Sequence, residues 1–134
     1  MSPERVHVLV GLIGDGHGRW LVNQRLAGTH RAGAWEFPGG KRAPGEDRAA
    51  ALERELAEEL GIETATSCLA PIAFASHGYE KFHLLMPVFA CRKWLGTPQP
   101  REGQALKWVM PAELSRYPMP PADVPLVALL RDLL

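Results

Sequence analysis

The chain has 134 residues, 46% of them hydrophobic, and is long enough to bury a core without disulfide bonds. Fifteen basic and fifteen acidic residues give a formal net charge of +0, so no global electrostatic field attracts this protein to nucleic acid or to a membrane. The two cysteines, Cys68 and Cys91, are too few for a disulfide framework and lack metal-site spacing, so we expect reduced thiols and a cytoplasmic location.

The predicted elements begin with a strand over residues 5–13, which is rich in β-branched residues and ends at a glycine-rich turn. Its apolar stretch is too short to span a bilayer and lacks a signal-peptide cleavage pattern. A returning strand is expected at residues 20–22. A short strand at residues 35–37 is cut off by Pro38 and the two glycines after it.

A helix is predicted over residues 47–60, because apolar side chains recur there at the three-to-four spacing of one buried stripe. Gly61 then ends the helix as a C-cap residue. The residues of the stripe are Ala49, Leu52, Leu56 and Leu60.

The second half of the chain contains two longer predicted strands, at residues 67–76 and 82–92, joined by a turn. Pro87 lies inside the second of them, which favours an edge strand or a bulge over a central strand. A short strand, a helical turn and an apolar helix follow at residues 105–109, 111–115 and 125–134. With no repeat and no linker, we expect one α+β domain over residues 1–134, with a mixed sheet between helices.

Three carboxylates crowd one sector of the predicted helix. Glu55 is a neighbour of Glu58 at i,i+3 and of Glu59 at i,i+4, an arrangement that costs roughly a few tenths of a kcal/mol per pair. A solvated acidic face is one interpretation. The other is a site for a hard divalent cation such as Mg²⁺, which binds through carboxylates and substrate phosphates. Arg54 can offset part of the repulsion by pairing with Glu58.

The residues before the predicted helix help to decide between a solvated acidic face and a cation site. The stretch GGKRAPGEDRAAALERELAEELGI follows the pattern G-x5-E-x7-R-E-U-x-E-E-x-G-U, where U is a bulky aliphatic residue, from Gly40 to Ile62. All nine constrained positions match. The stretch resembles the Nudix box, and on these residues the chain is identified as a member of the Nudix hydrolase family.

The resemblance implies an α/β/α sandwich and Mg²⁺-dependent cleavage of a nucleoside diphosphate linked to another group, with Mn²⁺ as a substitute metal. It assigns metal binding and catalysis to Glu55, Glu58 and Glu59. The carbonyl of Gly39 is a further ligand by resemblance, although a plain turn after Pro38 explains this glycine equally well. Metal ions held there would neutralise charge on phosphoryl oxygens and lower the pKa of a bound water.

Three more residues belong to this part of the chain. Arg54 is included with the catalytic residues, because in this family it orients a glutamate through a charge-assisted bond; an ordinary ion pair with Glu58 is nearly the same interpretation. Glu46 is expected in the loop scaffold. Lys41 either contacts phosphate or is an exposed, solubilising lysine.

The segments WEFPGGK, EGQALKWVMPAEL and YPMPPADVPL extend the resemblance to the MutT branch, whose members sanitise nucleotide pools by converting triphosphates to monophosphate and pyrophosphate. In that branch a loop glutamate joins the metal shell. Here it is Glu102, unless this is an ordinary loop residue. Arg25 matches an arginine that contacts the nucleotide, and Phe37 either stacks on the base or packs in the core.

Asp123 separates two substrate classes. MutT proteins of the 8-oxoguanine type usually present an asparagine in a P-A-N-x-P segment, whereas this chain has PADVP, an ending similar to that of the CTP pyrophosphohydrolase branch. An ionised aspartate only accepts hydrogen bonds and suits the amino group of cytosine or adenine, but burial can keep it protonated. Asp123 is also a natural N-cap for the last helix.

We therefore expect a nucleotide pyrophosphohydrolase that sanitises 8-oxo-dGTP and so serves DNA repair, with CTP or dCTP as the alternative substrate. A non-catalytic Nudix-like module that recognises damaged bases is the alternative of another class. Such modules lose box glutamates, and this chain keeps them all. The expected partner is a nucleoside triphosphate, without direct nucleic-acid or membrane binding, and the expected state is a monomer or weak dimer.

Overall fold

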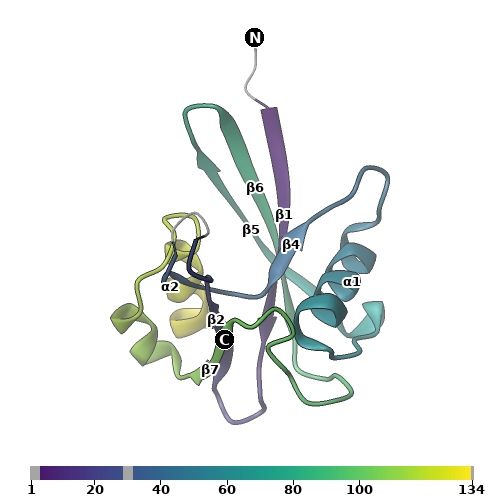
Figure 1. Ribbon diagram of the computed structural model, residues 1–134. Helices are drawn as coiled ribbons and strands as arrows, with labels where there is room; N and C mark the ends of the chain where they lie inside the picture. The colour runs from purple at the N-terminus through teal and green to yellow at the C-terminus, as the bar shows by residue number, and fades with distance from the viewer. Residues whose placement is uncertain (1–3, 29–31, 134) are drawn as a thin grey trace.

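The computed structural model describes residues 4–28 and 32–133 of the chain (Figure 1). The strands are β1 (Glu4–Ile13), β2 (Trp20–Gln24), β3 (Trp35–Glu36), β4 (Gly39–Lys41), β5 (Ala70–Gly78), β6 (Phe82–Cys91) and β7 (Ala105–Val109). The α-helices are α1 (Arg48–Leu60) and α2 (Val124–Leu133). Two short 3₁₀ helices are η1 (Thr66–Cys68) and η2 (Pro111–Arg116).

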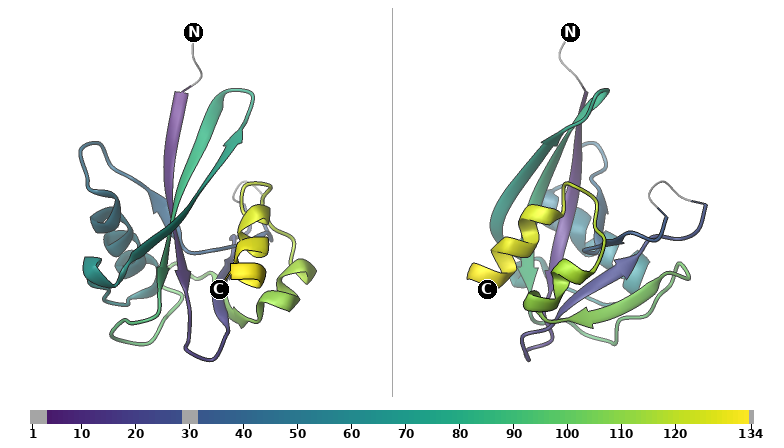
Figure 2. Two further views of the ribbon diagram at one scale, coloured as in Figure 1. Left: turned by 180° about the vertical axis from the view of Figure 1, so that it is seen from behind. Right: turned by 90° about the vertical axis from the view of Figure 1, so that its left-hand side faces the viewer.

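The strands form two sheets. A four-stranded mixed sheet has the order β4-β1-β6-β5, in which β1 and β6 run parallel and the other neighbours antiparallel. A three-stranded antiparallel sheet has the order β3-β2-β7. Helix α1 covers one face of the mixed sheet and α2 the other (Figures 1 and 2). The expected mixed sheet between helices is confirmed, with a second sheet beside it.

Side chains alternate along β1 and enter two separate cores. Val10 and Leu12 belong to a cluster under α2, whereas Leu9 and Ile13 belong to a cluster under α1. Complete burial of each such side chain contributes about 1.5–3 kcal/mol, so both faces of the mixed sheet stabilise the fold. The cluster under α1 also contains the fully buried leucines of the predicted stripe, Leu52, Leu56 and Leu60.

Helix α1 begins and ends where the sequence predicts. The Asp47 carboxylate accepts a hydrogen bond of 3.2 Å from the backbone N–H of Ala50 and so caps the first turn. Gly61 has a φ of 70°, a left-handed conformation that favours glycine, and its N–H donates to the carbonyl of Ala57. Both ends of the helix are therefore fixed, which holds its polar face in place beside β4.

The predicted edge position of Pro87 was wrong, but an irregularity does lie beside it, because the pairing of β5 with β6 shifts register between Pro71 and Ala73, opposite Phe89 and Val88. Strand β6 is a central strand, because it lies between β1 and β5. The parallel ladder with β1 is interrupted between the pairs His7–Leu85 and Val10–Val88. Pro87 lies within this interruption, where its missing N–H breaks no regular pairing with β1.

Two other assignments also change. Strand β2 pairs with β3 and β7, and it meets the end of β1 through a bridge between Gly14 and Trp20. The glycine pair after Pro38, expected to be a turn, begins β4 and pairs with β1. No helix within residues 4–28 and 32–133 is both long and apolar enough to cross a bilayer.

Candidate active site

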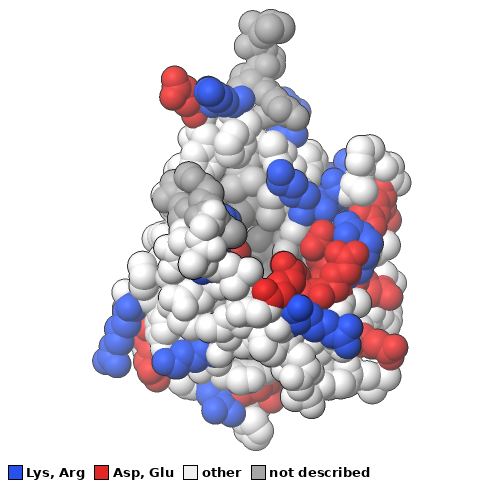
Figure 3. Space-filling model, in the orientation of Figure 1, with Lys and Arg blue, Asp and Glu red and all other residues white. Residues whose placement is uncertain are grey.

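A polar cavity of about 240 Å³ lies between the β3-β2-β7 sheet and the C-terminal part of α1. Figure 3 shows acidic side chains gathered on this side of the molecule, where β4 meets α1. The cavity is lined by residues of β2 and β3, of α1 and of the loop before β7, namely Asn23, Gln24, Arg25, Leu26, Glu36, Glu59, Glu102 and Gln104.

Arg54 connects three glutamates of the box. Its Nε lies 2.9 Å from Glu46, and its Nη1 lies 3.0 Å from Glu55 and 3.3 Å from Glu58. Its Nη2 donates to the carbonyl of Lys41 at 3.3 Å, which ties α1 to β4. The hydrogen bond between Arg54 and Glu46 lowers the pKa of that glutamate and raises the pKa of Arg54. The guanidinium thus compensates part of the crowded negative charge.

Glu55 lies directly against the backbone of Gly40 in β4. A Cβ at residue 40 would overlap the Glu55 carboxyl group, so this close approach requires glycine. Burial raises the pKa of Glu55 in spite of the Arg54 guanidinium, and the negative charges of Glu58 and Glu102 raise it further. The Glu55 carboxylate is therefore in a partly desolvated position, where more positive charge would stabilise it.

Glu59 is perturbed more strongly. Burial raises its pKa to about 8, and the negative charges of Glu102, Glu55 and Glu36 act in the same direction. A hydrogen bond of 3.2 Å from the N–H of Gly39 opposes this shift. A carboxyl group in such surroundings either keeps its proton near neutral pH or binds a cation.

The loop before β7 brings Glu102 to the same cavity. Gln104, 7% exposed, accepts a hydrogen bond of 2.9 Å from the N–H of Glu102 through its Oε1. Its Nε2 donates to the carbonyl of Glu59 at 3.2 Å. The sequence-based prediction did not include Gln104. Its position two residues after a candidate metal ligand was the available signal.

A second acidic pair, Glu36 and Asp123, lies around β3. Arg25 Nη2 is 3.0 Å from Glu36 Oε2, and burial raises the pKa of Glu36 despite this ion pair. Asp123, 7% exposed, accepts a hydrogen bond of 3.3 Å from the N–H of Phe37. Burial, and then the negative charge of Glu36, raise the pKa of Asp123 to about 7. At neutral pH its side chain therefore exists both as the acid and as the carboxylate.

Glu36 was also absent from the sequence-based prediction of the site. Its signal in the sequence was a carboxylate directly before Phe37 in the WEFPGGK segment. Phe37 itself is 5% exposed and belongs to the core cluster under α2, so we assign it to packing rather than to base stacking. Lys41 is exposed at the end of β4. Gly39 donates its N–H to Glu59, and metal binding by its carbonyl stays a prediction.

Three of the predicted metal-binding residues, Glu55, Glu59 and Glu102, are close enough for their charges to interact. Glu58 differs, because its side chain is 59% exposed and pairs with Arg54. In the part of the chain that the structure describes, no three His, Cys, Asp or Glu side chains are gathered in a metal-binding geometry. Glu55, Glu59 and Glu102 still fit a hard divalent cation, because they offer carboxylate oxygens whose negative charge is only partly neutralised by neighbouring residues.

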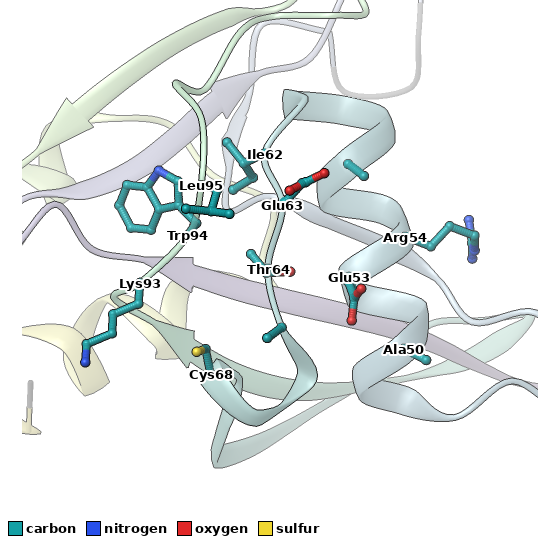
Figure 4. A pocket seen from close by; sticks show the side chains of 12 residues that line it. Ala50, Glu53, Arg54, Ile62, Glu63, Thr64, Cys68, Lys93, Trp94 and Leu95 are labelled. Carbon is teal, nitrogen blue, oxygen red and sulfur yellow. The ribbon is translucent and has the colours of Figure 1, made fainter.

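A larger hollow of about 740 Å³ lies on a different face of α1 (Figure 4). Its walls include Glu53, Thr64 and Trp94, whereas Glu55 and Glu59 are not among its lining residues. The larger hollow therefore lacks the buried carboxylates that a phosphate-bound cation requires. The smaller, polar cavity is the candidate active site.

The family model of the NUDIX domain matches residues 9–129. A CTP pyrophosphohydrolase of Escherichia coli (strain K12) is 41% identical over 121 residues, which cover 89% of this chain and 87% of the relative. An 8-oxo-dGTP diphosphatase of the same organism is 33% identical over 132 residues, 97% of this chain and 99% of the relative. The solution structure of the E. coli ORF135 protein matches with a TM-score of 0.85 and 36% identity, over 98% of this chain and 91% of that chain.

The chain belongs to the Nudix hydrolase family, as the box residues predict, and within it to the MutT-like proteins. It is a hydrolase that acts on phosphoanhydride bonds. Nudix hydrolases act on nucleotides and generally use divalent metal ions, in agreement with the chemistry of the carboxylates around the cavity.

Proposed function

We propose that this hydrolase is a Mg²⁺-dependent nucleoside triphosphate pyrophosphohydrolase that releases nucleoside monophosphate and pyrophosphate and prefers 8-oxo-dGTP. The observation that supports this function is the polarity of the cavity. One end carries the carboxylates of α1 and of the loop before β7, and the other carries Arg25 and Glu36 with Asp123 buried nearby. A nucleotide matches this arrangement. Its phosphates would bind cations at the acidic end, and its base would find hydrogen-bond partners at the other end.

The metal would be held by the acidic end of the cavity. When bound, Mg²⁺ would neutralise phosphoryl oxygens and lower the pKa of a water aimed at phosphorus. Arg54 orients Glu55 and Glu58 through its bonds to both. Lys41, exposed at the end of β4, is available to attract the phosphates. The proposed metal ligands are Glu55, Glu58, Glu59, Glu102 and the carbonyl of Gly39.

Asp123 is the residue that supports oxidised guanine as the preferred base of the substrate. Oxidation at C8 turns N7 from an acceptor into an N–H donor, so the base requires an acceptor there and a donor for O6. With a pKa of about 7, Asp123 is partly protonated at neutral pH, and a carboxylic acid both donates and accepts. Glu36, whose charge interacts with Asp123, provides a second acceptor.

CTP is the second candidate substrate. Asp123 stands where MutT proteins of the 8-oxoguanine type usually present asparagine, and the 41% identical relative carries the name CTP pyrophosphohydrolase. An ionised Asp123 would accept a hydrogen bond from the amino group of cytosine. The two candidates therefore differ in the protonation state that they require of one side chain.

The test is kcat/KM for 8-oxo-dGTP, dGTP, CTP and dCTP with the wild type and with Asp123→Asn. We expect the wild type to prefer 8-oxo-dGTP over dGTP by about a hundredfold, because the wrong base leaves buried polar groups unpaired. Asp123→Asn should preserve or improve hydrolysis of 8-oxo-dGTP and weaken hydrolysis of the cytosine nucleotides. A wild-type preference for CTP would replace the oxidised-guanine proposal, and equal changes for every base would leave Asp123 only a structural role before α2.

The same assay separates an enzyme from a binding module, since a module would bind these nucleotides without cleaving them. All the box glutamates are present, which supports the enzyme. We also propose that residues 1–134 form one Nudix domain that works in the cytoplasm as a monomer or weak dimer. Its cancelling charges support the absence of direct nucleic-acid binding.

A further inference from the structure

The last turn of α1 is attached to the loop before β7. Carbonyl groups at the end of a helix have no partner inside the helix and must find one elsewhere. Here the N–H of Gln99 donates to the carbonyl of Leu60 at 2.8 Å, and the N–H of Arg101 donates to the carbonyl of Glu59 at 3.1 Å. The loop therefore holds the backbone of Glu59 in place.

Gln104 adds a side-chain connection at the same point. Its Nε2 donates to the Glu59 carbonyl at 3.2 Å, and its Oε1 accepts from the Glu102 N–H at 2.9 Å. Because Gln104 is 7% exposed, removal of its amide would take away the partner of the Glu102 N–H and leave the Glu59 carbonyl with the Arg101 N–H alone. The amide thus spans the backbones of two acidic residues that line the same cavity.

We propose that Gln104 is a positioning residue for the acidic end of the cavity. Its amide fixes the separation of Glu59 and Glu102, so that both carboxylates are directed at one cation before that cation binds. The inference rests on the proposed metal role of these two glutamates, and it gives Gln104 no contact with metal or substrate. Groups that orient metal ligands in this way commonly change metal affinity by about 10–100-fold when they are removed.

The probe is Mn²⁺ binding to the full chain without nucleotide, measured by electron paramagnetic resonance. Gln104→Met keeps the length of the side chain and removes both hydrogen bonds, so we expect Mn²⁺ affinity to weaken about tenfold. Gln99→Ala is the matched control, because Gln99 is exposed and its backbone N–H makes the contact in either form. Gln104→Asn keeps the amide but is too short to reach both partners. It should also bind weakly and serves as the variant closest to the wild-type fold.

Glu102→Gln completes a double-mutant cycle. If Gln104 acts by positioning the Glu102 carboxylate, most of the effect of Gln104→Met should disappear in the Glu102→Gln background. Losses that multiply would overturn the inference, because Gln104 would then act elsewhere. Wild-type Mn²⁺ affinity in both Gln104 variants, or in Glu102→Gln, would overturn it as well. A protein that shows this coupling but does not cleave nucleotides would contradict only the proposed function.

Discussion

Glu59 combines three properties that rarely occur together in one side chain: it is acidic, it is largely withdrawn from solvent, and it is surrounded by other acids. The result is a pKa of about 8, so ionisation is unfavourable near neutral pH unless a cation is present. A chain without net charge can thereby develop strong local affinity for a positive ion at a single place.

Replacing Glu59 with Gln retains the size of the side chain and removes its charge. We expect kcat/KM for nucleotide hydrolysis at saturating Mg²⁺ to fall by at least about a hundredfold. The melting temperature should stay the same or rise, because a buried amide costs less than a buried carboxylate. Steady-state kinetics and thermal melts provide the measurement. Glu53→Gln, on the same helix but outside the polar cavity, should behave as wild type. A loss of less than about tenfold for Glu59→Gln would argue against metal contact.

The acidic residues also predict how the metal-free protein responds to pH. The unfolded chain releases the Glu59 proton near 4.5, whereas the folded protein keeps it until about 8. Asp123 behaves in the same way, with a pKa of 3.8 in the unfolded chain and of about 7 in the folded protein. Between these values the folded state binds more protons than the unfolded state, so the free energy of unfolding decreases as the pH rises. In a metal chelator we expect the melting temperature to be lower at pH 8.5 than at pH 5.5 by roughly 3 °C or more.

Two controls belong to this pH experiment. The Glu59→Gln/Asp123→Asn double variant should lose most of the pH dependence, because it lacks the two carboxyl groups whose pKa values are raised most. Added Mg²⁺ should raise the melting temperature of the wild type at pH 8.5, since it binds the ionised carboxylates of the folded state. Equal melting temperatures at the two pH values would contradict the assignment.

At the scale of elements, the packing of α1 against β4 places Glu55 where a side chain at residue 40 would lie. Gly40→Ala should therefore displace the Glu55 carboxyl group and weaken both Mn²⁺ affinity and hydrolysis by about tenfold or more. Gly78→Ala is the control, because a Cβ there meets its nearest atom, Nδ1 of His83, at 3.5 Å, an ordinary contact. Unchanged Mn²⁺ binding in Gly40→Ala would show that Glu55 is not held by this contact.

Elements whose causes are local could be predicted from the sequence. Helix α1 has its cap at Asp47, its apolar stripe and its terminal Gly61 within fifteen consecutive positions, and its observed bounds agree with the prediction to within one residue. Pro87 could not be placed correctly, because its effect depends on an interruption in the pairing with a strand near the other end of the chain. Strand β4 was missed for a similar reason: two glycines after a proline are typical of a turn, and only β1 gives them a partner.

The site of the whole molecule also combines residues that a local pattern predicts with residues that depend on distant partners. Residues of the box follow one another along a helix and a loop, so their spacing alone indicated a common patch. Gln104, which the sequence-based prediction missed, acquires its role through a partner far away in the chain, Glu59. Asp123 was named from the resemblance, but its contact with the distant Phe37 was not predicted. Such pairs depend on how the two sheets and α2 pack, and a single sequence carries no direct record of that packing.

The reaction of the intact enzyme gives a further prediction. If the protein follows the MutT branch, water attacks the β-phosphorus, and the products are nucleoside monophosphate and pyrophosphate. Hydrolysis in ¹⁸O-labelled water, followed by mass spectrometry, should place the label in pyrophosphate. Label in the monophosphate would mean attack at the α-phosphorus, and release of orthophosphate would exclude a pyrophosphohydrolase.

The two cores described above share β1 and β6 as their common wall, while β5 lies at the edge of the same sheet. Backbone amides covered on both sides exchange with solvent only when both layers open, which requires nearly complete unfolding. We expect hydrogen–deuterium exchange to be slowest in the middle of β1 and β6 and markedly faster in β5, as peptide-resolved mass spectrometry would show. Equal protection in β5 and β1 would contradict this. The slowest-exchanging amides would then report the global stability of the molecule, and their rates would separate variants that loosen the whole fold from those that disturb only the acidic cavity.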